Sequence, residues 1–180
     1  MKRLFVGIPV SEEIKVTLQP VVDQLRQTGA DLTMVAMDKP HFTLKFLGDV
    51  SEKEISFVLE KLETITVPKF TLSVAGVGVF PSLERINVIW IGTKSKDLIV
   101  LMKKITEQLN DIKKEEREEM PHLTLARVKS GRNKELLWEV IKKWENHDFG
   151  KMLADKFVLY ESTLKPEGPI YNVVKKFKLN

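Results

Sequence analysis

The amino-acid sequence predicts an α+β fold of two lobes, built from a duplicated unit. The phrase Pro-His-x-Thr-Leu occurs at residues 40–44 and again at residues 121–125, and each copy is followed by a polar turn and a helix-like segment. Strand-like and helix-like segments interleave along the chain, and no Gly/Ser linker or low-complexity tract separates them. A repeat inside one uninterrupted chain predicts a single domain over residues 1–180, made of two pseudo-symmetric lobes with one copy each.

The first half of the chain is expected to begin with a strand that leads into a capped helix. The strand is predicted over residues 4–10, and Ser11 marks the start of a helix that runs to Gln27. Pro20 is expected to kink this helix and Gly29 to stop it. A short strand is then expected over 32–35, and the first copy of the repeated phrase forms the next strand, over 41–47.

The remaining elements follow from capping residues and apolar periodicity. Ser51 and Glu54 have the spacing of a capping box, and the apolar residues after them recur at helical period. The later elements are expected in this order: strands over 70–79 and 86–91, a helix over 95–110, a solvated loop or helix end over the charged run 113–119, a strand over 122–129, a helix over 133–146, and strands over 157–164 and 171–179.

The composition excludes some kinds of chemistry and favours anionic binding partners. The chain has no cysteine, which excludes disulfides, cysteine nucleophiles and thiolate metal ligands. Its net charge of +4 favours anionic partners such as RNA or nucleotides. The apolar run near the start is too short for a signal peptide or a membrane span, so we expect a cytoplasmic protein without membrane contact. The high charge content and the excess of lysine over arginine are also seen in thermophile proteins.

Both copies of the repeated phrase place a histidine and a threonine on one face of a strand. Side chains alternate along a strand, so His41 shares a face with Thr43, and His122 shares a face with Thr124. Two imidazoles of pKa near 6.5 can hold opposite protonation states at neutral pH, one taking a proton from water and the other giving a proton to a departing ribose oxygen. Threonine hydroxyls can donate hydrogen bonds to phosphate oxygens as charge develops. The four side chains therefore indicate acid–base chemistry on a phosphate.

Simpler interpretations of these residues are also available. A lone histidine is often a partly buried residue satisfied by the backbone, and threonine is a common strand residue. A zinc site normally needs a third protein ligand, and no HExxH motif or carboxylate cluster lies near either copy. The chain has no GxxxxGK[ST] loop, GxGxxG phrase or GxSxG elbow, and His147 is interpreted as a surface residue. The matched contexts of the two motif histidines favour the catalytic interpretation.

The two phrases and their surroundings resemble the 2H phosphoesterases, which carry two HxTx motifs. More narrowly, the chain is similar to the RNA 2′,3′-cyclic phosphodiesterases of bacteria and archaea, historically named 2′-5′ RNA ligases. The likeness covers nearly the whole chain and is carried by Arg3–Ile8, His41–Gly48, Gly76–Pro81, Val88–Trp90, His122–Arg127, Leu159–Ser162 and Gly168–Tyr171. Met34-Val35 stands where family members often have Trp-Val.

The resemblance implies a bilobal fold in which two antiparallel sheets line a central cleft, with helices on the outside. It implies hydrolysis of a 2′,3′-cyclic phosphate, on an RNA end, an oligonucleotide or a cyclic nucleotide, to a 2′-phosphomonoester without a metal or other cofactor. His41 would be the proton donor to the leaving 3′ oxygen and His122 the acceptor that activates water, with Thr43 and Thr124 holding the phosphate. The residues alone leave open which histidine plays which part. The reverse reaction would give weak 2′-5′ RNA ligation.

Four further residues are candidates for substrate contact. Arg127 and Lys45 follow the two motifs and could bind phosphate or base, but strict alternation turns Arg127 away from the motif histidine unless a bulge intervenes. Phe80 and Tyr171 could stack a base, as could Trp90, although an aromatic residue in a strand more often belongs to the core. The alternative function is a non-catalytic module that binds RNA ends or nucleotides in the same cleft. The protein is expected to be a monomer.

Overall fold

The computed structural model describes residues 1–112, 120–163 and 169–180. Its elements, in chain order, are β1 (Lys2–Pro9), α1 (Glu12–Gln27), β2 (Leu32–Met34), β3 (His41–Val50), α2 (Glu52–Glu63), β4 (Phe70–Pro81), β5 (Ile86–Thr93), α3 (Lys96–Gln108), β6 (Leu123–Val128), α4 (Lys134–Trp144), β7 (Asp148–Ala154), β8 (Lys156–Thr163) and β9 (Ile170–Lys178). The charged run 113–119 and the last residue of the strand expected over 157–164 lie outside the described residues.

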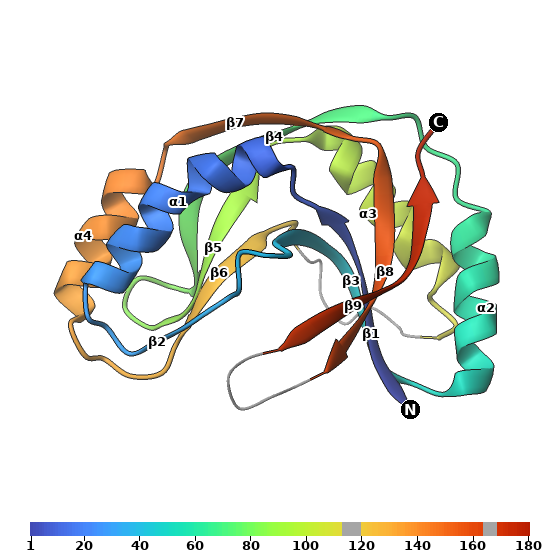
Figure 1. Ribbon diagram of the computed structural model, residues 1–180, viewed down its shortest axis with the longest axis horizontal. Coiled ribbons are helices and arrows are strands. Elements are labelled where there is room, and N and C mark those ends of the chain that lie inside the picture. Colours follow the sequence, from blue (N-terminus) through green and yellow to red (C-terminus); the bar gives the residue numbers. More distant parts are fainter. Residues whose placement is uncertain (113–119, 164–168) are drawn as a thin grey trace.

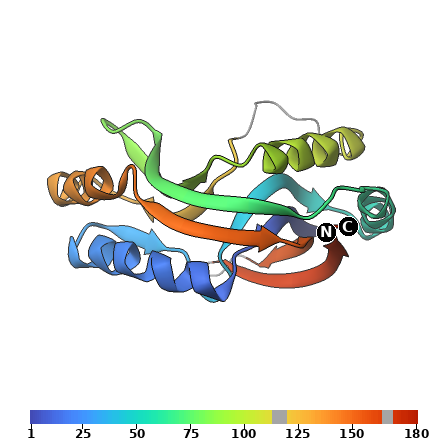
Figure 2. The same cartoon turned by 90° about the horizontal axis from the view of Figure 1, so that it is seen from above.

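Two antiparallel sheets carry the two copies of the repeated phrase. The smaller sheet has the strand order β3-β1-β8-β9, and the larger has the order β2-β6-β5-β4-β7. In Figure 1, α1 and α4 lie at one end of the molecule and α2 and α3 at the other, and the view from above in Figure 2 agrees. The predicted α+β fold with two antiparallel sheets and outer helices is confirmed.

Each lobe is completed by helices from both halves of the chain. α1 follows β1 of the four-stranded sheet but packs on β7 of the five-stranded sheet, whereas α3 follows β5 of the larger sheet and packs on β3 of the smaller one. One hydrophobic cluster consequently runs through both sheets and includes Leu18, Leu44 and Ile105, each of which is almost completely buried. Burying such a side chain contributes about 1.5–3 kcal/mol, so the shared core is what holds the two lobes together.

Serine side chains begin three of the helices, as their positions in the sequence predict. The Oγ atoms of Ser11, Ser51 and Ser95 each accept a hydrogen bond from the backbone N–H three residues later, at 3.4 Å. The backbone N–H of Ser51 in turn donates to Glu54 Oε2 at 2.9 Å, which completes the predicted capping box. A cap of this kind stabilises its helix by about 1 kcal/mol. None of the helices in the described part of the chain is long and apolar enough to cross a membrane.

Strand β7 is absent from the elements expected from the sequence, and Gly150 explains why. Met152 and Ala154 are buried and their neighbours are exposed, which is the alternation of a strand with one buried face. Gly150 interrupts this alternation with a φ of +108°, and the pairing of β4 with β7 shifts register at the same place. A bulge moves the following side chains to the other face, so the strand shows no continuous period of two in the sequence.

Candidate active site

The two copies of the repeated phrase meet side by side. β3 begins at His41, and His122 directly precedes β6. Thr43 and His122 form an antiparallel bridge, in which the backbone N–H of Thr43 donates to the carbonyl oxygen of His122 at 3.3 Å. Continuing this register sets His41 opposite Thr124, and alternation turns all four side chains to one face. Diagonal neighbours in such a pair have Cα atoms roughly 7–8 Å apart, so both imidazoles border one site.

The backbone holds both imidazoles in the same way. The Nδ1 atom of His41 lies 3.0 Å from the carbonyl oxygen of Lys39, and the Nδ1 atom of His122 lies 2.8 Å from that of Met120. A carbonyl oxygen can only accept, so Nδ1 carries the proton and donates in each ring. The Nε2 atom of a neutral ring is then free of its proton and available for chemistry. The repeated spacing, two residues before each histidine, produces the same tautomer in both copies.

Aromatic rings enclose His41. Its ring centroid lies 4.7 Å from that of Phe5, 4.9 Å from that of Tyr171 and 5.4 Å from that of Tyr160. Burial among these rings lowers the pKa of His41, because the charged imidazolium loses hydration. The backbone hydrogen bond acts in the opposite direction, and positive charge on His122 adds to the lowering. The electrostatic effect of one imidazole on the other is what two groups in one site should show.

His122 is held against a second aromatic wall. Its ring centroid lies 5.0 Å from that of Phe80 and 6.4 Å from that of Trp90. Gly78 makes room for the wall, because a Cβ atom at that position would come within 2.2 Å of the Trp90 ring. Burial lowers the pKa of His122, the backbone hydrogen bond opposes this, and the nearby guanidinium of Arg127 lowers the pKa further. Arg127 therefore lies within electrostatic reach of this histidine.

A cavity of about 260 Å³ opens on the face that carries these side chains. Among the residues predicted for the site, it is lined by His41, Thr43, Thr124, Arg127 and Tyr171. His122 borders this group but is not itself among the lining residues, and neither are Phe80 and Lys45. The structure thus brings side chains from both motif copies into one cavity between the two sheets, each copy coming from a different sheet.

A bulge turns Arg127 into this cavity. In the pairing of β5 with β6, Trp90 faces Thr124 and the next residue, Ile89, faces Ala126, so Leu125 has no partner of its own. The extra residue shifts the alternation of the side chains by one position, which puts Arg127 on the same face as Thr124. Strict alternation would point this side chain away from the site. Arg127 could contact a substrate only if a bulge intervened, and the structure contains that bulge.

The first copy of the motif carries the same bulge, which brings Phe46 into the cavity as a candidate that sequence reasoning missed. Val6 faces Lys45 and Gly7 faces Thr43, which leaves the residue between them without a partner. Phe46 therefore occupies the position in its copy that Arg127 occupies in the other, and it lines the cavity with 48% of its surface exposed. Phe46 and Arg127 each lie five residues after a motif histidine, and this shared spacing could have indicated Phe46 from the sequence.

Lys45 does not reach the cavity. The side chain is fully buried and follows the bulge on the interior face, opposite Val6 of β1. The cavity lining therefore does not include this lysine, which was expected to contact the substrate from its place after the motif, and includes the next residue, Phe46. The reason is again the bulge, which exchanges the faces of consecutive side chains.

Other predicted positions fall where the sequence suggests. Met34 and Val35, where members of the family often carry Trp-Val, line the cavity, so this departure changes the cavity lining. His147 is exposed and packs against the rings of Trp144 and Phe149, at 4.5 and 4.8 Å. Within residues 1–112, 120–163 and 169–180, no three His, Asp or Glu side chains gather as ligands for a metal ion.

The sequence matches the model of one protein family twice. The family is described as LigT like Phosphoesterase, and the matches cover residues 8–90 and 91–171. The chain is 37% identical over 176 residues to a Methanocaldococcus jannaschii protein named RNA 2′,3′-cyclic phosphodiesterase, covering 97% of this chain and 99% of that one. It is 36% identical to a Thermotoga maritima protein of the same name, covering 96% and 92% of the two chains.

Solved structures share the arrangement of the whole chain. The crystal structure of TT0787 from Thermus thermophilus superposes with a TM-score of 0.83 at 25% identity and covers 98% of this chain and 97% of that one. E. coli LigT in its apo form gives a TM-score of 0.80 at 25% identity, covering 99% and 98%. The same E. coli protein has been crystallised in complex with 3′-AMP, and that structure gives a TM-score of 0.79.

Proposed function

Because the chain belongs to the LigT like phosphoesterase family, we propose that it is an RNA 2′,3′-cyclic phosphodiesterase that uses His41 and His122 as its acid–base pair. One observation carries the proposal: the antiparallel bridge between Thr43 and His122, which aligns both motif copies on one face. The site faces a cavity large enough for a phosphate and its ribose. The substrate is the cyclic phosphate at an RNA or oligonucleotide end, or a cyclic mononucleotide.

The two imidazoles act on opposite sides of the phosphorus atom. His122 takes a proton from a water molecule as its oxygen attacks phosphorus, and the bond from phosphorus to O3′ breaks in line with that attack. His41 donates its proton to O3′, so the product is a 2′-phosphomonoester with a free 3′-hydroxyl. This assignment of donor and acceptor follows the family resemblance. Solvent then returns the pair to its starting protonation, because the reaction moves one proton from His41 to His122.

Three side chains hold the phosphate while charge develops on it. The hydroxyls of Thr43 and Thr124 donate to its non-bridging oxygens from the two lobes, and both residues line the cavity. The guanidinium of Arg127 adds a charge-assisted contact from the same face. Phe46 and Tyr171, both from the four-stranded sheet, offer ring surfaces on which the base can stack.

Substrate binding favours uptake from solvent of the proton that the reaction needs. In the free protein, burial and neighbouring positive charge lower the pKa of both histidines, which favours neutral rings. The anionic cyclic phosphate counteracts this, since a negative charge beside an imidazole raises its pKa. The complex therefore holds one proton on the pair, as general acid and base catalysis requires.

The proposal is tested with a nucleoside 2′,3′-cyclic phosphate and the purified protein. His41→Ala and His122→Ala are each expected to lower kcat by about 10²–10⁴-fold with little change in Tm. His147→Ala, which removes the exposed third histidine, is the matched control and should keep full activity. Full activity of either motif variant would overturn the two-histidine mechanism.

The product and the response to a chelator separate this proposal from its rivals. Phosphorus NMR should show the 2′-phosphomonoester only, and activity should persist in EDTA because the mechanism uses no metal. A non-catalytic binding module would bind RNA ends without forming 2′-phosphate after long incubation. Weak 2′-5′ ligation, in which an RNA 5′-hydroxyl replaces water as the nucleophile that attacks the cyclic phosphate in the same site, should be lost in the same two variants.

A further inference from the structure

A second cavity rimmed by lysines lies directly beyond His41. It has a volume of about 190 Å³, and Lys15, Lys39, Lys156 and Lys176 line it together with Asp38. Tyr160 also lines it, and the ring of Tyr160 lies close to that of His41, with the centroids 5.4 Å apart. Tyr160 therefore contributes both to this cavity and to the surroundings of the proposed acid.

The lysine cavity continues the cleft face of the four-stranded sheet. Phe5, Val158 and Tyr160 form a small apolar cluster apart from the main core, and Tyr171 packs against it. Phe5 and Tyr171 line the catalytic cavity, whereas Val158 and Tyr160 line the lysine cavity. The same small apolar cluster therefore borders both cavities.

The charge of the lysine cavity is positive. The Nζ atoms of Lys15 and Lys39 donate to the carbonyl oxygens of Asp38 and Tyr171, at 2.9 and 2.8 Å, which positions the ammonium groups without neutralising them. Lys15 also pairs with Glu12 at 2.6 Å and Lys156 with Asp155 at 2.9 Å, both near the surface, where such pairs are weak.

The geometry of in-line attack indicates on which side of the phosphate the RNA chain lies. Water attacks phosphorus from the side of His122, so the leaving O3′ lies on the side of His41. O3′ stays on the ribose, and the ribose carries the rest of the RNA through its 5′ oxygen. We propose that the lysine cavity binds the phosphodiester backbone immediately upstream of the cyclic end, so that the enzyme prefers oligonucleotides to cyclic mononucleotides. This inference rests on the proposed function and extends it.

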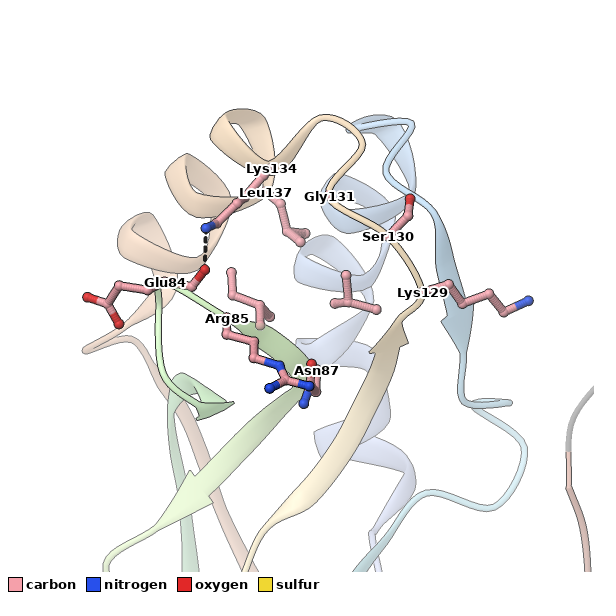
Figure 3. A pocket seen from close by; sticks show the side chains of 10 residues that line it. Glu84, Arg85, Asn87, Lys129, Ser130, Gly131, Lys134 and Leu137 are labelled. Atoms are coloured by element: carbon pink, nitrogen blue, oxygen red, sulfur yellow. Dashed lines mark hydrogen bonds between the residues drawn. The ribbon is translucent and has the colours of Figure 1, made fainter.

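A cavity in the other lobe offers a matched comparison. It has a volume of about 230 Å³, and Arg85, Asn87, Lys129 and Lys134 line it. Figure 3 shows that these side chains come from the start of β5, the end of β6 and the start of α4, with Lys134 bonded to the carbonyl oxygen of Glu84. β6 begins directly after His122 and leads through Arg127 to this cavity, so the cavity belongs to the lobe of the proposed base. The cavity in Figure 3 is also basic, but the RNA chain is not expected to reach it if the chain leaves the site on the side of His41.

The test compares two double variants on two substrates. Lys156→Ala/Lys176→Ala removes two cations from the lysine cavity, and Arg85→Ala/Lys129→Ala removes two from the cavity in Figure 3. The substrates are a nucleoside 2′,3′-cyclic phosphate and a short single-stranded RNA with the same terminal nucleotide. The first variant should lower kcat/KM for the oligonucleotide by about tenfold and leave that for the mononucleotide within about twofold. The second should change neither value.

The salt dependence of oligonucleotide binding gives an independent measurement. The slope of log K against log salt concentration should become shallower by about 0.7 for each phosphate that the first variant no longer binds. The inference is overturned if the first variant keeps the oligonucleotide preference, if the Figure 3 variant loses it, or if the unchanged protein hydrolyses both substrates equally well. In each of these results hydrolysis of either substrate still supports the proposed function, whereas a lack of hydrolysis of both substrates by the unchanged protein would refute that function itself.

Discussion

The glycine beneath Trp90 should control both the stability of the protein and the position of His122. In Gly78→Ala the new Cβ would lie 2.2 Å from two atoms of the Trp90 benzo ring, far inside van der Waals contact, so the ring must move. Overpacking of this kind costs about 1–3 kcal/mol. In a protein of this size each kcal/mol lowers Tm by about 2–4 °C, so a decrease of roughly 2–12 °C is expected. Because the displaced ring packs beside His122, kcat should fall as well.

Thermal melting and steady-state kinetics on a cyclic mononucleotide measure the two effects. Gly131→Ala is the matched control, because a Cβ atom there meets nothing within 4 Å. Trp90→Phe replaces the indole by a smaller ring and also removes a buried N–H that has no hydrogen-bond partner in the described structure. The double variant Gly78→Ala/Trp90→Phe should therefore be less destabilised than the sum of the two single changes. Strict additivity, or a Gly78→Ala protein as stable and active as the unchanged one, would refute the packing argument.

Four further predictions concern the site and the fold. Arg127→Gln should move the acidic limb of the pH profile of kcat/KM to higher pH, because removing the guanidinium removes a charge that lowers the pKa of His122, the proposed base; an unmoved limb would contradict this. Phe46→Ala should raise KM for a cyclic mononucleotide by about 5–150-fold with a smaller effect on kcat, since a stacked base contributes about 1–3 kcal/mol. An unchanged KM would show that Phe46 does not contact the base. In the protein without substitutions, the alkaline limb of the pH profile of kcat/KM should lie below about pH 6.5, the ordinary imidazole pKa. The reason is that the pKa values of both His41 and His122 are lowered. An alkaline limb above about pH 6.5 would show that another group controls the reaction. Ser51→Ala should lower the free energy of unfolding by about 0.5–2 kcal/mol, because α2 loses its N-terminal cap, and should leave kcat and KM unchanged. An unchanged midpoint of denaturant unfolding would show that the cap does not stabilise the protein.

Local features of the fold were predictable because their causes are local. The caps at Ser11, Ser51 and Ser95 depend on residues within one helical turn, and their hydrogen bonds match the prediction. The shared backbone anchor of the two imidazoles also depends on residues only two positions away. Strand β7 escaped prediction because the bulge at Gly150 hides its alternation. The crossing of α1 and α3 between the lobes arises from long-range packing that no short window contains.

The identity of the groups proposed to carry the chemistry could be predicted from the chain alone. The spacing of His and Thr within each copy puts the two side chains on one face of a strand, because alternation needs only neighbouring residues. Duplication of the phrase predicted two such faces and therefore two lobes. The match of the family model to each half of the chain agrees with this duplication.

The way in which these faces combine depends on the folded protein. The bridge between Thr43 and His122 joins strands of two different sheets, and its register depends on how the whole chain packs. The bulges after Thr43 and Thr124 turn Phe46 and Arg127 into the cavity and leave Lys45 in the interior. Bulges and register are properties of paired strands, so a single strand cannot specify them. For that reason the four motif side chains are visible in the amino-acid sequence, while the wall proposed to receive the substrate became visible only once the strands were paired.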